Sequence, residues 1–283
     1  NEDLAHILGA LLAEATIHEK EIEFCNADKE WINEFEERWQ RVFPDCRLHK
    51  FNRKPSSYGK KPYQTLEIHS RHVVAFLKNL GALPVKSPER TIPHVIFGSP
   101  KPIAAEFLRA YFEGDGSISF SGAKMIELSC ISKSEKLISQ LQTLLLRFGI
   151  VGTKRFDSYR ATRKLYIRGM RQYLTFRDAI GFVSHNKNTK LSAAIARLKK
   201  EYSQNDFVPF LSNFVRRYPF GASLEHSFVT RNNFDRYAHL KRNYAQVLSA
   251  VKPQLKTEIQ VLFDRLLSDH YLFDPITKIE DGG

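Results

Sequence analysis

The sequence is poor in cysteine and contains no long apolar run, and each shortage excludes a class of protein. Its 283 residues include three cysteines, which are scattered and form no CxxC pair, so a disulfide framework and a cysteine zinc site are both excluded. No stretch approaches the roughly 20 apolar residues of a membrane span, and the first residues lack the basic start of a signal peptide. We therefore expect reduced thiols and an intracellular protein, in the cytoplasm, the nucleoid or an organelle, without membrane contact.

Acidic residues are also scarce relative to basic ones. The chain has 31 Asp and Glu against 43 Lys and Arg, which gives a net charge of +12 and favours a polyanionic partner, with nucleic acid as the leading candidate. The charge is uneven, because residues 19–37 are acidic whereas residues 47–61 and 153–171 are basic. Polar and apolar residues alternate within or beside each basic run, which predicts strands of a sheet whose exposed face is largely basic.

The two basic runs belong to an internal repeat. LGALLAEATI (8–17) aligns with RAYFEGDGSI (109–118) at an offset of 101 residues, which pairs Glu14 with Asp115. In each half, two strands, an amphipathic helix, a basic strand pair and a short helix follow the motif. The pattern predicts an α+β protein in which tandem αββαββα units form two antiparallel sheets about a pseudo-twofold axis, with a small helical appendage at the end. The expected boundaries are residues 1–100, 101–203 and 204–283.

Each motif places a carboxylate at the end of a helix, where the helix dipole disfavours negative charge by up to roughly 1 kcal/mol. Small residues four apart, such as Gly9 and Ala13, form a stripe on each helix that lets the two backbones pack closely. A twofold axis between the helices would then bring Glu14 and Asp115 to one point, together with two helix carbonyl ends. We expect a divalent cation to hold these four negative features together.

These motifs resemble the paired LAGLIDADG motifs of single-chain homing endonucleases, most closely those of intein-encoded type. The likeness covers residues 4 to about 200 and includes RTIPHVIFGSPKPIAAEFLRAYFEGDGSI (90–118) and IGFVSHNKNTKL (180–191). The first copy departs from the usual glycine and aspartate with Ala15 and Glu14, although glutamate remains an oxygen ligand for a hard cation. The stretch DHYLFDPITKIEDGG (269–283) resembles the point where an intein re-enters its splicing domain. No nucleophile opens the sequence and no His-Asn closes it, so we expect no splicing.

The resemblance implies a DNA homing endonuclease that acts as a monomer, because its two motifs form an internal pseudo-dimer. The helix pair would lie over the minor groove of a long asymmetric site, and the two sheets would form a saddle on the flanking major grooves. Glu14 and Asp115 match the acids that bind Mg²⁺, with Mn²⁺ able to substitute, and the carbonyls of Ala13 and Gly114 are further candidate ligands. Metal-assisted hydrolysis of two phosphodiester bonds in duplex DNA would leave 3′ overhangs.

The resemblance also implies one basic residue, commonly lysine, in each active centre. By position these are Arg90 and Lys187, which follow the acid of their own repeat by 76 and 72 residues. Arg90 departs from the usual lysine. A guanidinium stays protonated, so it can clamp a phosphate but does not readily share a proton with water. We therefore expect the two DNA strands to be cut at unequal rates.

The basic runs supply the candidate DNA contacts. Phosphate contacts are expected to make binding steeply salt-dependent, whereas side chains on the exposed strand faces would choose bases. The candidates are Arg47, Lys50, Asn52, Arg53, Lys54, Lys60, Lys61, Gln64, Lys154, Arg155, Arg160, Arg163, Lys164, Tyr166 and Arg168. Those expected to contact bases are Lys50, Asn52, Gln64, Arg163, Lys164, Tyr166 and Arg168.

Other interpretations stay open. Taken alone, GALLAEA is an ordinary packed helix and GDGS an ordinary turn, and an EF-hand is disfavoured because Phe120 stands where its loop requires glycine. His69 and His72 could share a metal but fit surface positions better, and Lys187 could cap its loop. The helical appendage could extend the DNA footprint or pack on the main body. An RNA maturase or a non-cleaving DNA-binding regulator could use the same fold, although the presence of both acids favours cleavage.

Overall fold

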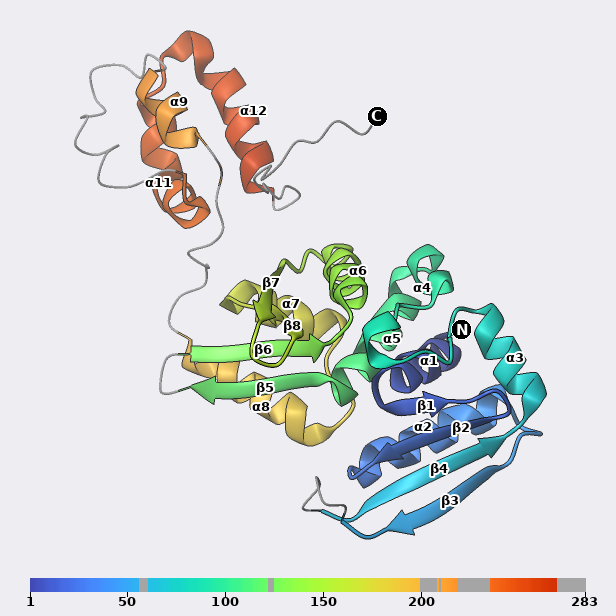
Figure 1. Ribbon diagram of the computed structural model, residues 1–283. Coiled ribbons are helices and arrows are strands. Elements are labelled where there is room, and N and C mark those ends of the chain that lie inside the picture. The colour runs from blue at the N-terminus through green and yellow to red at the C-terminus, as the bar shows by residue number, and fades with distance from the viewer. Residues whose placement is uncertain (56–60, 122–124, 199–207, 209, 218–234, 269–283) are drawn as a thin grey trace. The chain divides into compact units, whose positions relative to one another are not determined.

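The computed structural model of the protein forms two compact units, Asn1–Lys199 and Lys200–Gly283 (Figure 1). It describes residues 1–55, 61–121, 125–198, 208, 210–217 and 235–268. Over these residues, no helix has the length and apolar character needed to cross a membrane.

The first unit contains the same αββαββα arrangement twice. In the first copy, α1 (Glu2–Glu14) leads to β1 (Ala15–Ile17), β2 (Glu21–Asn26), α2 (Lys29–Val42), β3 (Leu48–Arg53), β4 (Tyr63–His69) and α3 (Arg71–Asn79). In the second copy, α5 (Lys101–Gly114) leads to β5 (Gly116–Ser121), β6 (Met125–Ser132), α6 (Glu135–Leu146), β7 (Gly152–Asp157), β8 (Thr162–Ile167) and α7 (Met170–Ala179). The strand orders, β1-β2-β4-β3 and β5-β6-β8-β7, are the same, and every pairing is antiparallel. The predicted α+β class and tandem repeat are confirmed.

Further helical elements join or follow these two copies. The short helices η1 (Ser87–Glu89) and α4 (His94–Gly98) connect the copies, and α8 (His185–Arg197) follows the second. Ser184 begins α8 as its N-cap, with a hydroxyl that accepts a hydrogen bond from the backbone N–H of Lys187. Lys187 therefore lies in the first turn of a helix rather than in a loop.

Each sheet has one face covered by helices of its own copy. In the first copy, Phe24 of β2 stacks on Phe35 of α2 with ring centroids 4.2 Å apart and meets Trp31 edge to face. In the second, α6 buries a stripe of leucines that includes Leu137 and Leu141. Burial of each such side chain contributes about 1.5–3 kcal/mol, so these contacts fix which face of each sheet points inward.

Helices α1 and α5 lie side by side between the two sheets, and their backbones approach closely (Figure 1). A Cβ atom on Gly9 would lie 2.2 Å from the Phe107 carbonyl oxygen, and one on Gly114 would lie 2.6 Å from the Cβ of Ala13. Only glycine fits at these two points. The small-residue packing predicted from the motif is confirmed, and it brings the ends of both helices to the same place.

A buried ionic cluster joins the same two helices nearer the start of α1. Glu106 of α5 pairs with Arg38 at 3.2 Å and with Arg109 at 2.7 Å, and His6 Nδ1 lies 3.3 Å from its Oε2. Burial lowers the pKa of His6, so its imidazole is neutral at pH 7. Losing one partner of a buried cluster is strongly destabilising, so the cluster helps to fix how the two helices sit on each other.

The second unit has a hydrophobic core of its own. Its described elements are α9 (Leu211–Arg217), α11 (Tyr237–Ser249), η2 (Pro253–Leu255) and α12 (Lys256–Leu267). The hydroxyl of Tyr237 donates to the Leu267 carbonyl at 2.8 Å, which joins the start of α11 to the end of α12, while Leu240 and Phe263 are fully buried. The stretch at 269–283, expected to resemble a splicing-domain junction, lies outside the described residues.

Candidate metal centre and nucleic-acid interface

The two acids of the repeated motif come together at the paired helix ends. Glu14 is the last residue of α1, and Asp115 caps α5. A Cβ on Gly114 would lie 2.9 Å from Glu14 Cγ, so the end of α5 lies directly against the Glu14 side chain. Burial, with the neighbouring Glu14 charge, raises the pKa of Asp115 to about 7, and burial also raises the pKa of Glu14. The structure therefore brings both predicted acids to one half-buried site.

Arg90 caps the end of α1 from the loop between η1 and α4. Its Nη1 donates to the carbonyls of Leu12 at 2.8 Å and Ala13 at 3.3 Å, and its Nη2 donates to that of Ala15 at 3.0 Å. A cation at this end offsets the negative end of the helix dipole. Arg90 thus supplies part of the positive charge that the acidic helix end requires. The Ala13 carbonyl, which was predicted to bind metal, already accepts one hydrogen bond from Arg90.

Lys187 caps the end of α5 in the equivalent way. Its ammonium donates to the carbonyls of Phe112 at 3.4 Å and Gly116 at 3.0 Å, and to that of Glu113. Two of these carbonyls lie 101 residues after carbonyls bound by Arg90, so the two cations occupy matching places in the two copies. The carbonyl of Gly114, the other main-chain oxygen predicted to bind metal, belongs to the same turn.

Glu113 is a residue of this site that sequence reasoning did not assign. It is 5 % exposed, and its carboxylate accepts hydrogen bonds from the backbone N–H groups of Val183 at 2.8 Å and Ser184 at 3.0 Å. One of its oxygens also lies 3.7 Å from Lys187 Nζ. Glu113 therefore holds the start of α8 and the lysine that α8 carries. Its partners lie about 70 residues further along the chain, so no local pattern marks it.

Two more unassigned side chains touch the acids. Asn26, at the end of β2, donates from Nδ2 to Glu14 Oε1 at 3.2 Å. Tyr111 lies one helical turn before Asp115, and burial together with the Asp115 charge raises the pKa of its hydroxyl. An asparagine in a strand and a tyrosine in an apolar helix are common residues, so only the tertiary contact gives them a role.

The donor set fits a hard divalent cation. Two carboxylates and main-chain carbonyls provide oxygen ligands only, which suits Mg²⁺ or Mn²⁺. Among the described residues, no group of three or more His, Cys, Asp and Glu side chains stands close enough to hold a metal. The carboxylates would thus need oxygens from the main chain, water or a phosphate to complete the shell.

The open face of the first sheet is acidic. Strand register groups its residues by face, and the face opposite α2 carries Glu21, Glu23, Cys25, His49, Phe51, Arg53, Tyr63, Thr65, Glu67 and His69. Arg53 is paired with Glu67 at 2.8 Å, and His69 lies 3.3 Å from Glu21. Three carboxylates against one arginine make the expectation of a basic face wrong for this sheet.

Three candidate base contacts of the first sheet lie on its covered face. Lys50 binds Glu36 of α2 at 2.9 Å, and Gln64 Nε2 donates to Asn52 Oδ1 at 2.9 Å. The buried Leu66 of β4 shows which residues of the strand pair face the helices. Its register partner is Lys50, and every second residue from either of them lies on the same covered face. The prediction that Lys50, Asn52 and Gln64 extend from the exposed face is therefore wrong.

The open face of the second sheet carries hydroxyls and paired cations. Its residues are Ser117, Ser119, Glu127, Ser129, Ile131, Thr153, Arg155, Asp157, Thr162, Lys164 and Tyr166. Lys164 lies 4.8 Å over the Tyr166 ring and pairs with Glu127, while Arg168, just beyond β8, lies 4.3 Å over the same ring. Lys164 and Tyr166 thus lie on the exposed face as predicted, and Arg155 lies on it as well.

Two other candidates in this sheet lie on its covered face. Arg163 pairs with Glu135 of α6 and stacks on Phe156 at 4.9 Å, and Lys154 donates to the Ser139 hydroxyl at 3.2 Å. The strand pairing places both residues on the face of the sheet opposite to Lys164. The prediction that Arg163 reaches bases from the exposed face is wrong, because its guanidinium is turned toward α6.

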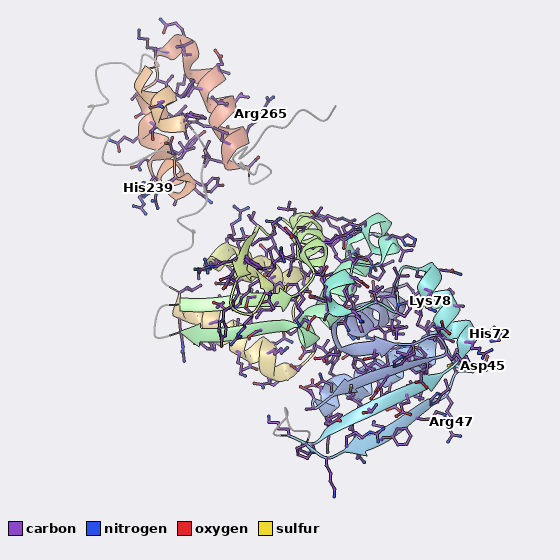
Figure 2. The ribbon with its side chains drawn as sticks, viewed as in Figure 1. Asp45, Arg47, His72, Lys78, His239 and Arg265 are labelled. Atoms are coloured by element: carbon purple, nitrogen blue, oxygen red, sulfur yellow. The ribbon has the colours of Figure 1, made fainter. Side chains whose placement is uncertain are left out.

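The remaining basic candidates lie at sheet edges and hairpin ends. Arg47 is exposed just before β3, on the same side of the unit as the labelled His72 of α3 (Figure 2). Lys54 and Lys61 are exposed beside the β3–β4 connection, and Arg160 is exposed between β7 and β8. Lys60 lies outside the described residues.

Comparison with known proteins finds a family domain in the second copy. Residues 102–181 match the model of the LAGLIDADG-like domain. The chain is 25% identical to the DNA gyrase A protein of Mycolicibacterium flavescens over 280 residues, which are 98% of this chain and 49% of that protein. It is 33% identical to the replication factor C small subunit of Methanocaldococcus jannaschii over 201 residues, 68% of this chain and 10% of that one. The crystal structure of I-DmoI in complex with DNA and Ca matches with a TM-score of 0.48 and 12% identity, covering 68% of this chain and 96% of that chain. The chain spans half or less of the length of these curated relatives.

Proposed function

We propose, because residues 102–181 match the model of the LAGLIDADG-like domain, that the protein is a site-specific, Mg²⁺-dependent endonuclease that cuts both strands of duplex DNA. The observation that carries the proposal is the meeting of Glu14 and Asp115 at two helix ends, each capped by a cation of the chain. A binding-only protein has no need for two half-buried carboxylates at one point. Two equivalent centres, one from each copy, suit a reaction at two phosphodiester bonds.

The four site residues divide the chemistry between them. Glu14 and Asp115, with main-chain carbonyls of the same turns, would hold the cation. When bound there, a divalent cation polarises a scissile phosphate and lowers the pKa of an attacking water. Arg90 and Lys187 are held beside the acids by carbonyl acceptors, where they stabilise the negative charge that develops on the phosphate. Their positions are set before substrate binds, which is the condition for electrostatic catalysis.

The substrate is double-stranded DNA bound by the protein as a monomer. The two open sheet faces would lie in major grooves on either side of the cut, and the helix pair would lie over the minor groove between them. Cuts across the minor groove leave 3′ overhangs. Because the residues on the two open faces differ throughout, the site recognised would be long and asymmetric.

We also infer that the chain is the endonuclease part of an intein. Nearly the whole chain matches within half of a gyrase protein, and two thirds of it match within a tenth of a replication factor C protein. A single segment found within proteins of unrelated function is expected of a mobile insertion. The inference predicts that the gene's flanking sequence encodes two halves of one host protein with splicing motifs at the junctions, and an uninterrupted open reading frame with neither would refute it.

The test of the nuclease is selection of cleaved sites from a plasmid library with random inserts, in Mg²⁺. The wild-type protein should yield linear molecules whose ends share one sequence and a 3′ overhang of constant length. Asp115→Asn should reduce cleavage by at least about 100-fold while leaving DNA binding largely intact. Asp45→Asn, at an exposed position outside the site, is the matched control and should cut normally.

The outcomes separate the candidate functions. Undiminished cleavage by Asp115→Asn would rule out the proposed centre. Sequence-specific DNA binding without cleavage would instead identify a regulator, and binding to structured RNA without DNA cleavage would identify a maturase.

A further inference from the structure

Tyr111 carries a buried hydroxyl that the proposed chemistry has not used. The residue is 0 % exposed, and its hydroxyl has no hydrogen-bond partner of standard geometry in the described part of the chain. A buried polar group left without a partner costs about 1–3 kcal/mol. Phenylalanine would fill the same space without that cost, so the hydroxyl calls for an explanation beyond packing.

The position of the hydroxyl points to the acid of the same helix. Tyr111 and Asp115 are four residues apart at the end of α5, which places them on one face of the helix. Burial, with the nearby Asp115 charge, raises the pKa of the Tyr111 hydroxyl, and the other groups near it are the buried Cys130 thiol and the Arg90 charge. The ring is fixed edge to face against Phe112, with centroids 5.9 Å apart. Side chains four residues apart on a helix lie within reach of each other, so the carboxyl can accept from the hydroxyl once a cation fixes its orientation.

The first copy orients its acid by a different route. The residue equivalent to Tyr111 at the 101-residue offset is Ala10, which has no polar side chain. Glu14 instead receives the amide of Asn26 from β2 at 3.2 Å. One acid is thus held by a strand amide and the other is faced by a hydroxyl of its own helix.

We propose that Tyr111 is a positioning residue whose hydroxyl donates to Asp115 and fixes the carboxylate oxygen that is turned toward the divalent cation. The inference rests on the proposed metal centre. Tyr111 touches neither DNA nor metal and acts through Asp115 alone. Partners that orient a metal ligand in this way typically contribute 10–100-fold in metal affinity or activity.

The test measures Mn²⁺ affinity directly, by electron paramagnetic resonance of unbound Mn²⁺, with and without a short DNA duplex. Tyr111→Phe should weaken Mn²⁺ binding by about 10-fold, and Asp115→Asn should weaken it further. Without Mn²⁺, Tyr111→Phe should melt at the same temperature as the wild type or higher, because the hydroxyl completes no hydrogen bond until the cation orients Asp115.

Tyr173→Phe is the matched control. Tyr173 is 3 % exposed, and its hydroxyl donates to the Ile126 carbonyl at 2.9 Å, outside the metal centre. Its loss should lower the melting temperature and leave Mn²⁺ affinity unchanged. A merely structural role for Tyr111 would give this same pattern.

Each outcome decides the inference. Equal Mn²⁺ affinity in the wild type and Tyr111→Phe would overturn it, whatever the melting temperatures. Absence of Mn²⁺ binding by the wild type, with and without DNA, would overturn both the inference and the metal centre. Weaker Mn²⁺ binding by Tyr111→Phe in a protein that cuts no DNA would support the inference while the nuclease proposal fails.

Discussion

The two copies have the same order of helices and strands, but nearly every side chain that they contribute to the candidate site differs. Both end their first helix in an acid, and both return a cation to the same carbonyls of that helix end. The acid is Glu14 in one copy and Asp115 in the other, and the cation is Arg90 in one and Lys187 in the other. The repeated fold therefore fixes where an acid and a cation lie, whereas the residue type at each of these positions differs between the copies.

The cations also differ in how they are held. Arg90 comes from a loop and contacts three carbonyls through its planar guanidinium. Lys187 comes from the first turn of α8, whose start is fixed by the buried carboxylate of Glu113. The lysine ammonium is a compact charge that can shift its pKa, and burial lowers the pKa of Lys187. In the proposed mechanism, we therefore expect the second centre to hold the cation that exchanges a proton with water.

The open faces of the two sheets differ in charge. The first has three glutamates against one arginine, and the second has Arg155 and Lys164 against Glu127 and Asp157, with Arg168 just beyond. In a DNA complex, the first face is suited to accept hydrogen bonds from base amino groups, because glutamate accepts from cytosine N4. The second face is better suited to attract phosphate.

The largest expected effect comes from separating the two copies. Gly9→Ala would place a Cβ 2.2 Å from the Phe107 carbonyl oxygen, so the helix pair must shift, and we expect a loss of about 3 kcal/mol in the free energy of unfolding. Urea unfolding followed by circular dichroism measures it. Gly98→Ala, where a Cβ meets nothing within 4 Å, is the control and should change stability by under about 0.5 kcal/mol. Equal effects of the two substitutions would show that the helices are not closely packed.

Exchanging the cations should change the rate difference between the two strands. The wild type should cut one strand faster, Arg90→Lys should narrow the ratio of the two rates, and Lys187→Arg should slow the faster strand, each by about 10-fold. A duplex labelled on each strand and resolved on a denaturing gel gives both rates. If neither substitution changes the ratio of the two cleavage rates, Arg90 and Lys187 do not cause the difference between the two centres.

Smaller effects are expected from the open faces. Lys164→Gln should weaken DNA binding and reduce the slope of log affinity against log salt by about one, because one cation that can neutralise phosphate charge is lost. Glu23→Gln should strengthen binding a few-fold at low salt, with less effect at high salt, because a like charge near phosphate is removed. Affinity measured across a KCl series tests both. An unchanged salt slope for Lys164→Gln would place DNA away from this face.

Sequence predicted the features that follow from local pattern and symmetry. The repeated motif predicted the fold, the helix packing and the meeting of Glu14 with Asp115, because the offset that aligns the sequence also aligns the helix ends. The first basic run was harder to place on a face, because Phe51 puts an apolar residue on the open face and Lys50 a charge on the covered one. Only pairing with β4 resolves that ambiguity.

The partners of the charged groups could not be predicted in the same way. Glu113 contacts backbone N–H groups that follow it by about 70 residues, and Asn26 reaches Glu14 from a strand. Such contacts depend on how complete elements pack, and no spacing in the chain encodes them. The hydroxyl of Tyr111 has an apparent role only because it is buried without a partner one helical turn from Asp115.

The most direct measurement is a crystal structure of the protein with its cleaved DNA site and Mn²⁺, with the metal located by anomalous scattering. We predict an anomalous peak bound by Glu14, Asp115 and phosphate oxygens at the α1–α5 helix ends. A Mn²⁺ peak at the cut phosphates with both carboxylates turned away from it, or DNA bound away from the helix ends, would contradict the shared metal centre.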